Sequence, residues 1–147
     1  MKTYVITVSR NFPGKHPRKG EETCFIEKIK SGVKLHTIRG NYELWVKRFE
    51  KIEKGEACLS LRYWEGKPYS SKQVEFLRLD KSDGIGIQKV EFFDYLYGVN
   101  IDDRPQGTFI NVLAKNDGLN NADFESWFRG YDLSKPMALI HFTKFRY

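Results

Sequence analysis

Hydrophobic and polar positions follow two rhythms along this chain, one typical of strands and one typical of helices. Residues 4–9 alternate, so that Tyr4, Ile6 and Val8 share one face of an extended segment. Residues 41–54 instead repeat their apolar side chains at helical spacing. Alternation predicts five strands, at 4–9, 57–64, about 72–79, about 85–93 and 137–145. Helical spacing predicts three helices, at 23–31, at 41–54 and after Asn120.

Capping residues mark where the predicted helices begin and end. Thr23 and Asn41 are suited to cap the first two helices, and Gly32 is suited to end the first. Asn120 stands three residues before Asp123, a polar pair that resembles a capping box. These signals place the helix boundaries independently of the hydrophobic pattern.

Four further segments carry weaker patterns. Residues 10–20 hold two prolines and two glycines and predict a loop. Residues 33–39 are extended or turn-like, 94–108 are turn-rich, and 109–116 fit either a strand or a helix. The order of elements predicts an α+β fold class in one domain, residues 1–147, with flanking helices. Its sheet is expected to be mostly antiparallel and curled, or closed into a small barrel.

Composition narrows the class of protein. The chain of 147 residues is 40% hydrophobic and 30% charged, which suits one globular domain and excludes a disordered chain. No apolar run approaches ~18 residues, and the first residues lack the apolar core of a signal peptide, so no membrane partner is expected. Cys24, Cys58 and the three histidines match no metal-ligand spacing. We therefore expect buried, reduced thiols, a cytoplasmic location, no metal and no cofactor.

The positive charge is concentrated in the first half of the chain. The net charge is +6, but residues 1–72 carry sixteen Lys and Arg against eight Asp and Glu, whereas residues 73–147 carry nine against eleven. The most basic segment is the loop at 10–20, whose cations are Arg10, Lys15, Arg18 and Lys19. This asymmetry suggests a basic face for a polyanion such as RNA. The alternative is that a modest positive charge only keeps the protein in solution.

Candidate chemistry gathers in the segment that follows the first predicted helix. An amine, an imidazole, a hydroxyl and a guanidinium stand within six residues there. In a binding role, Lys34 and Arg39 would contact phosphate, while His36 and Thr37 would form hydrogen bonds with a base or a sugar. Tyr42, or one of the later aromatic side chains, would supply a ring on which a base can stack.

Several polar and aromatic side chains also have a structural interpretation. Arg39 could pair with Glu43 at the start of the second helix, where an acid is favourable. Trp64 could stack on a base, but packing beneath the turn that follows its strand is favoured. His141 is expected to be a hydrogen-bonded core histidine, and His16 to be exposed to solvent.

Three runs of residues together resemble one protein family. The run Gly32-Val33-Lys34-Leu35-His36-Thr37-Ile38-Arg39 resembles the signature of the ASCH domains, which belong to the PUA-like superfamily. The later run Asn116-Asp117-Gly118-Leu119 and the closing strand Ala138-Leu139-Ile140-His141-Phe142 are similar to blocks that follow it in that family. The resemblance implies a PUA-like small β-barrel with flanking helices, a cleft beside the first motif, and a role in RNA metabolism.

Small bacterial members of the family resemble acetylcytidine amidohydrolases, which implies a second possible activity. By position, the resemblance implies Thr37 as nucleophile, Lys34 as base and Asp117 as acid, although Asp117 is one methylene shorter than the family's glutamate. Lys34 could act as a base only if burial or a neighbouring cation lowered its pKa. Positions three apart on a flat strand point to opposite faces, so Lys34 and Thr37 converge only if the segment bends.

The leading prediction is a protein that binds RNA or a nucleoside-like ligand in a basic cleft. Lys34, Thr37, Arg39 and Asp117 are expected to line this cleft, with the loop at 10–20 near its mouth. The alternative is an amidohydrolase that acts on an acylated nucleoside such as acetylcytidine. A structural subunit of a larger assembly is a third interpretation.

Overall fold

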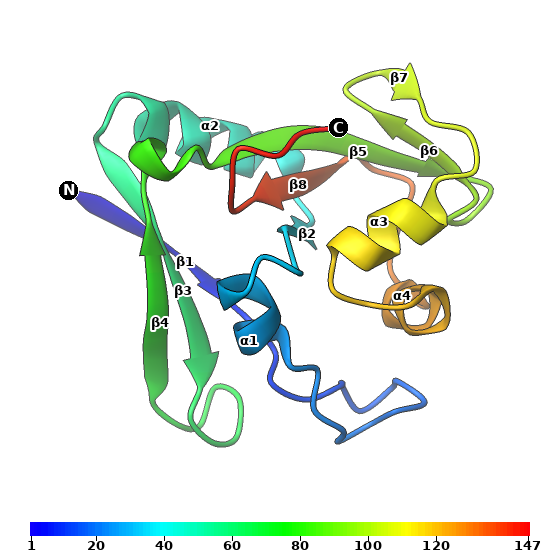
Figure 1. Ribbon diagram of the computed structural model, residues 1–147, viewed down its shortest axis with the longest axis horizontal. Coiled ribbons are helices and arrows are strands. Elements are labelled where there is room, and N and C mark those ends of the chain that lie inside the picture. The colour runs from blue at the N-terminus through cyan, green and yellow to red at the C-terminus, as the bar shows by residue number, and fades with distance from the viewer.

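The computed structural model describes residues 1–147 and arranges eight strands in two sheets, with four helices packed around them (Figure 1). The smaller sheet has the strand order β1-β3-β4. β1 pairs in parallel with β3, and β3 pairs antiparallel with β4, with a register shift after Leu61. These strands are β1 (Lys2–Thr7), β3 (Ala57–Trp64) and β4 (Gln73–Leu79).

The larger sheet has five strands, all antiparallel, in the order β2-β8-β5-β6-β7. Every residue of β8 is buried, since the strand has a neighbour on each side and a covered face above and below. Thr37 in β2 lies opposite Ile140 in β8. The five strands are β2 (His36–Arg39), β5 (Gly86–Phe93), β6 (Gly98–Ile101), β7 (Arg104–Pro105) and β8 (Met137–His141).

The expected α+β class and mostly antiparallel pairing are confirmed, but the strands form no closed barrel. The chain leaves the smaller sheet at the end of β4, passes through a single 3-10 turn, Lys81–Asp83, and enters the larger sheet at β5. Each sheet keeps two edge strands, which are β1 and β4 in one and β2 and β7 in the other.

Local capping explains where the four helices begin. The side chain of Asn41 accepts a hydrogen bond from the backbone of Leu44, and that of Asn120 accepts one from Asp123, so both predicted caps are confirmed. Thr23 Oγ1 accepts from the backbone N–H of Phe25, but the N-cap of this helix is Cys24, one residue later than predicted. The helices are α1 (Phe25–Lys30), α2 (Tyr42–Glu53), α3 (Ile110–Asn116) and α4 (Asn121–Phe128).

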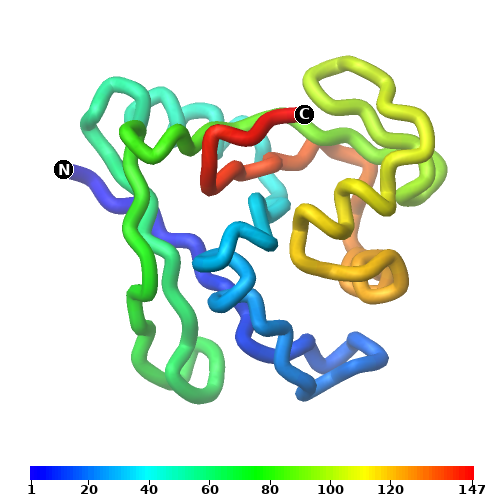
Figure 2. The backbone as a smooth tube through the Cα atoms, viewed as in Figure 1, coloured from blue at the N-terminus to red at the C-terminus, as the bar shows by residue number.

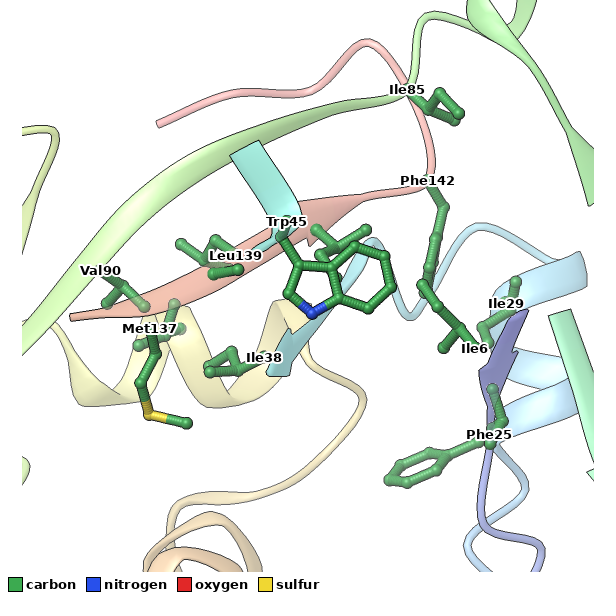
Figure 3. Packing of buried hydrophobic residues seen from close by; sticks show 14 of the residues in the cluster. Ile6, Phe25, Ile29, Ile38, Trp45, Ile85, Val90, Met137, Leu139 and Phe142 are labelled. Carbon is green, nitrogen blue, oxygen red and sulfur yellow. The ribbon is translucent and has the colours of Figure 1, made fainter. Parts of the chain in front are cut away.

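One continuous core joins the two sheets (Figure 3). Trp45 of α2 lies over Leu139 of β8, and Ile38 of β2 lies nearby. Ile6 of β1 and Phe25 of α1 extend the same core toward the smaller sheet. Apolar burial on this scale is the main stabilising contribution in a domain of this size.

The remaining differences from the predicted elements lie in the second half of the chain. The segment 109–116 contains the helix α3, which begins at Ile110, and the turn-rich segment 94–108 contains the short strands β6 and β7. The last strand ends at His141, because the chain then turns and runs beside β5, as Figure 2 shows. Cys58 is buried as expected, whereas Cys24 is exposed. None of the helices combines the length and the apolar character needed to cross a membrane.

Candidate functional site

The turn after α1 points Lys34 into the protein. Gly32 adopts a left-handed conformation with φ of +79°, which glycine reaches without strain. The backbone N–H groups of Val33 and Lys34 both donate to the carbonyl of Lys28, at 2.8 and 2.9 Å. Lys34 therefore lies before β2 rather than on it, and the chain has the bend that its convergence with Thr37 required.

Asp117 reaches the same place from the end of α3. It is the C-cap residue of that helix, and Gly118 follows with φ of +83°. A Cβ atom at Gly118 would stand 3.2 Å from Lys34 Cβ, so only glycine permits this close approach without displacing the lysine. Lys28 Nζ also donates to the Gly118 carbonyl at 2.8 Å, which fastens α1 to the turn.

Lys34 and Asp117 form a buried ion pair. Lys34 Nζ donates to the Asp117 backbone carbonyl at 2.7 Å and to Asp117 Oδ1 at 3.1 Å. Only 3% of Lys34 and 6% of Asp117 is exposed. The amine also lies 4.3 Å from the centre of the Phe25 ring, a cation–π contact.

Burial and pairing set the protonation of this pair. Burial lowers the pKa of Lys34 below its ordinary value, although Asp117 opposes that shift. Burial alone would raise the pKa of Asp117, but Lys34 and His36 outweigh it and hold that pKa below its ordinary value. Asp117 is therefore a carboxylate at neutral pH, and Lys34 loses its proton more readily than an exposed lysine does.

His36 stands behind Asp117 and connects it to the aromatic side chain of Tyr147. His36 Nδ1 lies 3.1 Å from Asp117 Oδ1, and His36 Nε2 lies 2.5 Å from the Tyr147 hydroxyl. Asn116 Nδ2 donates to the same hydroxyl at 3.1 Å. Because a carboxylate only accepts, Nδ1 carries the proton, and the Tyr147 hydroxyl donates to Nε2. Burial lowers the pKa of His36, which keeps the ring neutral.

Arg39 fixes the position of the Thr37 side chain by a hydrogen bond. Arg39 Nη1 donates to Thr37 Oγ1 at 3.0 Å, and Nη2 donates to the Thr7 carbonyl at 2.7 Å. Arg39 forms no ion pair with Glu43, so that structural interpretation is wrong. Thr37 Oγ1 accepts from Arg39 and keeps its own proton available for another partner. No hydrogen bond joins Lys34 to Thr37 directly.

A small cavity brings these groups together. It encloses about 40 Å³, room for roughly three water-sized groups, and Lys34, Thr37, Arg39 and Asp117 all line it. Asp117 Oδ1 is occupied by Lys34 and His36, but no protein group donates to Oδ2. The apolar walls come from six side chains, namely Val8, Phe25, Ile38, Leu119, Trp127 and Phe128.

The other predicted binding residues lie away from this cavity. His36 is behind Asp117, and Tyr42 begins α2 without lining the cavity. Arg10 lies over the Tyr63 ring at 5.1 Å and lines a separate groove. Two further cations of the loop, Lys15 and Lys19, are exposed and form no ion pair.

The basic loop, residues 10–20, is bound to α4. The sequence of the loop did not indicate this contact. Arg18 Nη1 binds Asp123 Oδ2 at 2.5 Å, and His16 Nε2 bonds to the Asp123 carbonyl at 3.0 Å. His16 is 4% exposed and stacks on Phe12 at 4.5 Å, so its predicted exposure to solvent is wrong. The proline beside it suggested a solvated turn, but the imidazole packs against an aromatic cluster that includes Trp127.

Two other interpretations from the sequence are confirmed. His141 is fully buried and hydrogen-bonded through Nε2 to Gln88 Oε1 at 2.9 Å. The Trp64 ring packs against Tyr69 in the turn that follows β3, with ring centres 5.2 Å apart. Sequence reasoning missed Tyr147 and Trp127 as parts of the site, because only tertiary packing brings them there.

Comparison with protein-family models, with curated proteins and with solved structures finds no match for this chain. No group of three or more His, Cys, Asp or Glu side chains is placed to hold a metal ion. The chemical role of the cavity therefore rests on the side chains that line it.

Proposed function

We propose that this chain is a PUA-like ASCH protein that binds a nucleoside-like ligand, with one polar substituent of the ligand in the Lys34 cavity. The observation that carries the proposal is the meeting of Lys34, Thr37, Arg39 and Asp117 around one small space. These four residues come from segments about eighty positions apart, and three of them, Lys34, Thr37 and Asp117, are the positions to which the family resemblance assigns a role.

The free hydrogen-bonding groups of Thr37 and Asp117 determine which kind of substituent the cavity can bind. Thr37 still has a hydroxyl proton to donate, and Asp117 Oδ2 still has lone pairs to accept. A substituent that offers one acceptor and one N–H donor satisfies both, as an amide group does. Phe25 and Trp127 give the apolar wall that a small acyl group needs.

The size of the cavity limits its occupant to one substituent of a larger ligand. A volume of about 40 Å³ admits a substituent of a few heavy atoms, not a stacked base with its sugar and phosphate. The basic loop also gives less support to a polymer than its composition suggested, because Arg18 is already bound to Asp123. Lys15 and Lys19 remain unpaired for contact with phosphate.

Amide hydrolysis is the second candidate, and the free proton of Thr37 together with the lowered pKa of Lys34 favours it. Lys34, which is paired with Asp117 as an ammonium, would first have to lose a proton to solvent. Thr37 Oγ would then attack the acyl carbon while its proton passes to the neutral Lys34 amine. The C–N bond would then break, and the departing amine would take that proton. Water would finally hydrolyse the acyl-threonine and release the acid. Since Lys34 and Thr37 share no hydrogen bond here, the substrate would have to bring them together.

Acetylcytidine is the probe that tests both candidates. We expect binding by calorimetry to the unmodified protein, and binding about tenfold weaker or worse for Thr37→Val, which loses the donor. Thr37→Ser keeps the hydroxyl and should retain most of the affinity. Thr108→Val is the matched control, because Thr108 is exposed and lies outside the cavity.

Release of acetate separates binding from catalysis. Acetate formed by the unmodified protein and by Thr37→Ser, but not by Thr37→Val, would establish hydrolysis. Binding without acetate would leave the protein as a binding protein only. If the unmodified protein showed no affinity at millimolar acetylcytidine, the proposal for this nucleoside would be wrong.

A further inference from the structure

A larger groove lies next to the cavity, on the far side of Phe25. It encloses about 570 Å³ and runs between α1 and the strands β3 and β4. Binding sites for small molecules in proteins typically span ~300–1,000 Å³, so this space fits a nucleoside whereas the cavity does not.

The cavity and the groove share a wall and a continuous piece of backbone. Phe25 lines both spaces. Val8 and Ser9 line the cavity, and the next two residues, Arg10 and Asn11, line the groove. The two spaces therefore adjoin at Phe25, and a ligand that occupies both has to extend past this side chain along residues 8–11.

An aromatic surface forms the side of the groove made by the smaller sheet. The rings of Tyr63 and Phe76 lie 6.1 Å apart at 35°, and both side chains are only partly buried. The Arg10 guanidinium lies 5.1 Å over the Tyr63 ring, so it covers that face of the ring and adds its own planar group to the lining of the groove. Planar heteroaromatic rings pack well on such surfaces, because every base offers an apolar face.

The charges around the groove balance. Arg10 and Lys30 supply two cations, and Glu22 and Glu27 supply two carboxylates, none of which forms an ion pair. The fifth charged side chain, Glu75, is already bound to Arg78. The groove therefore offers no net attraction to phosphate, while its carboxylates can accept hydrogen bonds from sugar hydroxyls.

We propose that this groove binds the base and the sugar of an uncharged nucleoside whose substituent occupies the Lys34 cavity. The inference rests on the proposed function and adds the second half of the ligand site, together with a preference for a nucleoside over a nucleotide. Tyr63 and Phe76 support the rings, and Arg10 closes the groove from the loop side.

The test compares two tyrosines and three probes by calorimetry. Tyr63→Leu should weaken the binding of acetylcytidine about tenfold, because the ring surface is lost. Tyr97→Leu is the matched control, since Tyr97 is exposed and contacts no other ring. Acetylcytosine, which lacks the sugar, should bind more weakly than acetylcytidine to the unmodified protein. Acetylcytidine 5′-monophosphate should bind no more than about twofold more tightly.

Methyl NMR locates the ligand without a mutation in the site. Acetylcytidine should shift the methyl signals of Ile26 and Val74, which line the groove, and leave those of the exposed Val112 in place. If Thr37→Val abolished binding while Tyr63→Leu did not change it and these methyl signals stayed still, the groove would be excluded and the cavity proposal would stand. Absence of any binding to the unmodified protein would overturn both. Binding of the monophosphate tenfold more tightly would overturn the preference for an uncharged ligand.

Discussion

Two buried histidines show how single residues organise this site. His36 donates a hydrogen bond from Nδ1–H to Asp117 Oδ1 and accepts one at Nε2 from the Tyr147 hydroxyl. His141 has the opposite arrangement, because Gln88 Oε1 accepts from Nε2 and Nδ1 has no partner. Gln88 Nε2 donates to Asp102 and to the Tyr147 carbonyl, which fixes the orientation of its amide.

We predict that the two rings occupy opposite tautomers. Long-range ¹H–¹⁵N NMR near neutral pH should give a protonated Nδ1 for His36 and a protonated Nε2 for His141. Tyr147→Phe should shift the Nε2 signal of His36 and leave that of His141 nearly unchanged, since the hydroxyl touches only His36 and Asn116. The same variant should lose about 1 kcal/mol of unfolding free energy in urea, the usual value of such a hydrogen bond. Finding the proton on Nε2 of His36 would contradict the hydrogen bond from its Nδ1 to Asp117.

Elements with strong local signals could be predicted from the sequence, and elements that depend on distant partners could not. Asn41 and Asn120 cap helices through hydrogen bonds to residues three positions away in the sequence. The local sequence was therefore sufficient to predict where these two helices begin. The strands β6 and β7 are short, and they depend on the pairing of β6 with β5 and of β7 with β6, which no local pattern reveals. The segment 10–20 was correctly predicted as a loop, but its attachment to α4 depends on Asp123, more than a hundred residues away.

This attachment predicts how the loop responds to the loss of Arg18. Arg18 joins Asp123 and also lies 4.7 Å from the Phe12 ring, so Arg18→Ala should loosen the loop around His16. Trypsin should then cut after Lys15 and Lys19 about fivefold faster, even though the variant has one cleavage site fewer. Equal or slower cutting would mean that the aromatic contacts of Phe12 and His16 hold the loop without the ion pair.

The matched control removes a loop cation that has no partner. Lys19→Ala also deletes one cleavage site, and Lys19 forms no ion pair in the structure. Cutting after Lys15 should therefore stay at the rate of the unmodified protein. The comparison separates the effect of the Asp123 contact from the effect of positive charge.

At the scale of the whole molecule, the site forms where three distant parts of the chain meet. Lys34 follows α1, Asp117 ends α3, and Tyr147 returns beside β5 after the last strand. The first motif was visible in the sequence because its polar side chains are neighbours. The place of Asp117 was implied only by a family resemblance, and that of Tyr147 had no signal, since its contacts arise from the packing of both sheets against the helices.

The buried histidines also predict how the stability of the whole fold depends on pH. Burial lowers the pKa of His141 from 6.5 to about 3, and it lowers the pKa of His36 as well. In the unfolded chain both rings bind protons below about pH 6.5, whereas in the folded protein they stay neutral. The unfolded state therefore binds more protons, so stability is complete above about pH 6.5 and falls as the pH is lowered toward the folded values.

Urea unfolding between pH 7.5 and 4.5 measures this loss, and the lower limit avoids the range in which Asp117 begins to titrate. Each histidine contributes up to roughly 1.4 kcal/mol per pH unit, so the two together give a slope of up to roughly 2.7 kcal/mol per unit. His141→Gln should lower the stability at pH 7.5 and reduce the slope by about half, because His36 is then the one remaining histidine whose pKa burial lowers. A slope that the substitution left unchanged would mean that His141 takes up its proton in the folded protein, and a new partner for Nδ1 would then have to be present.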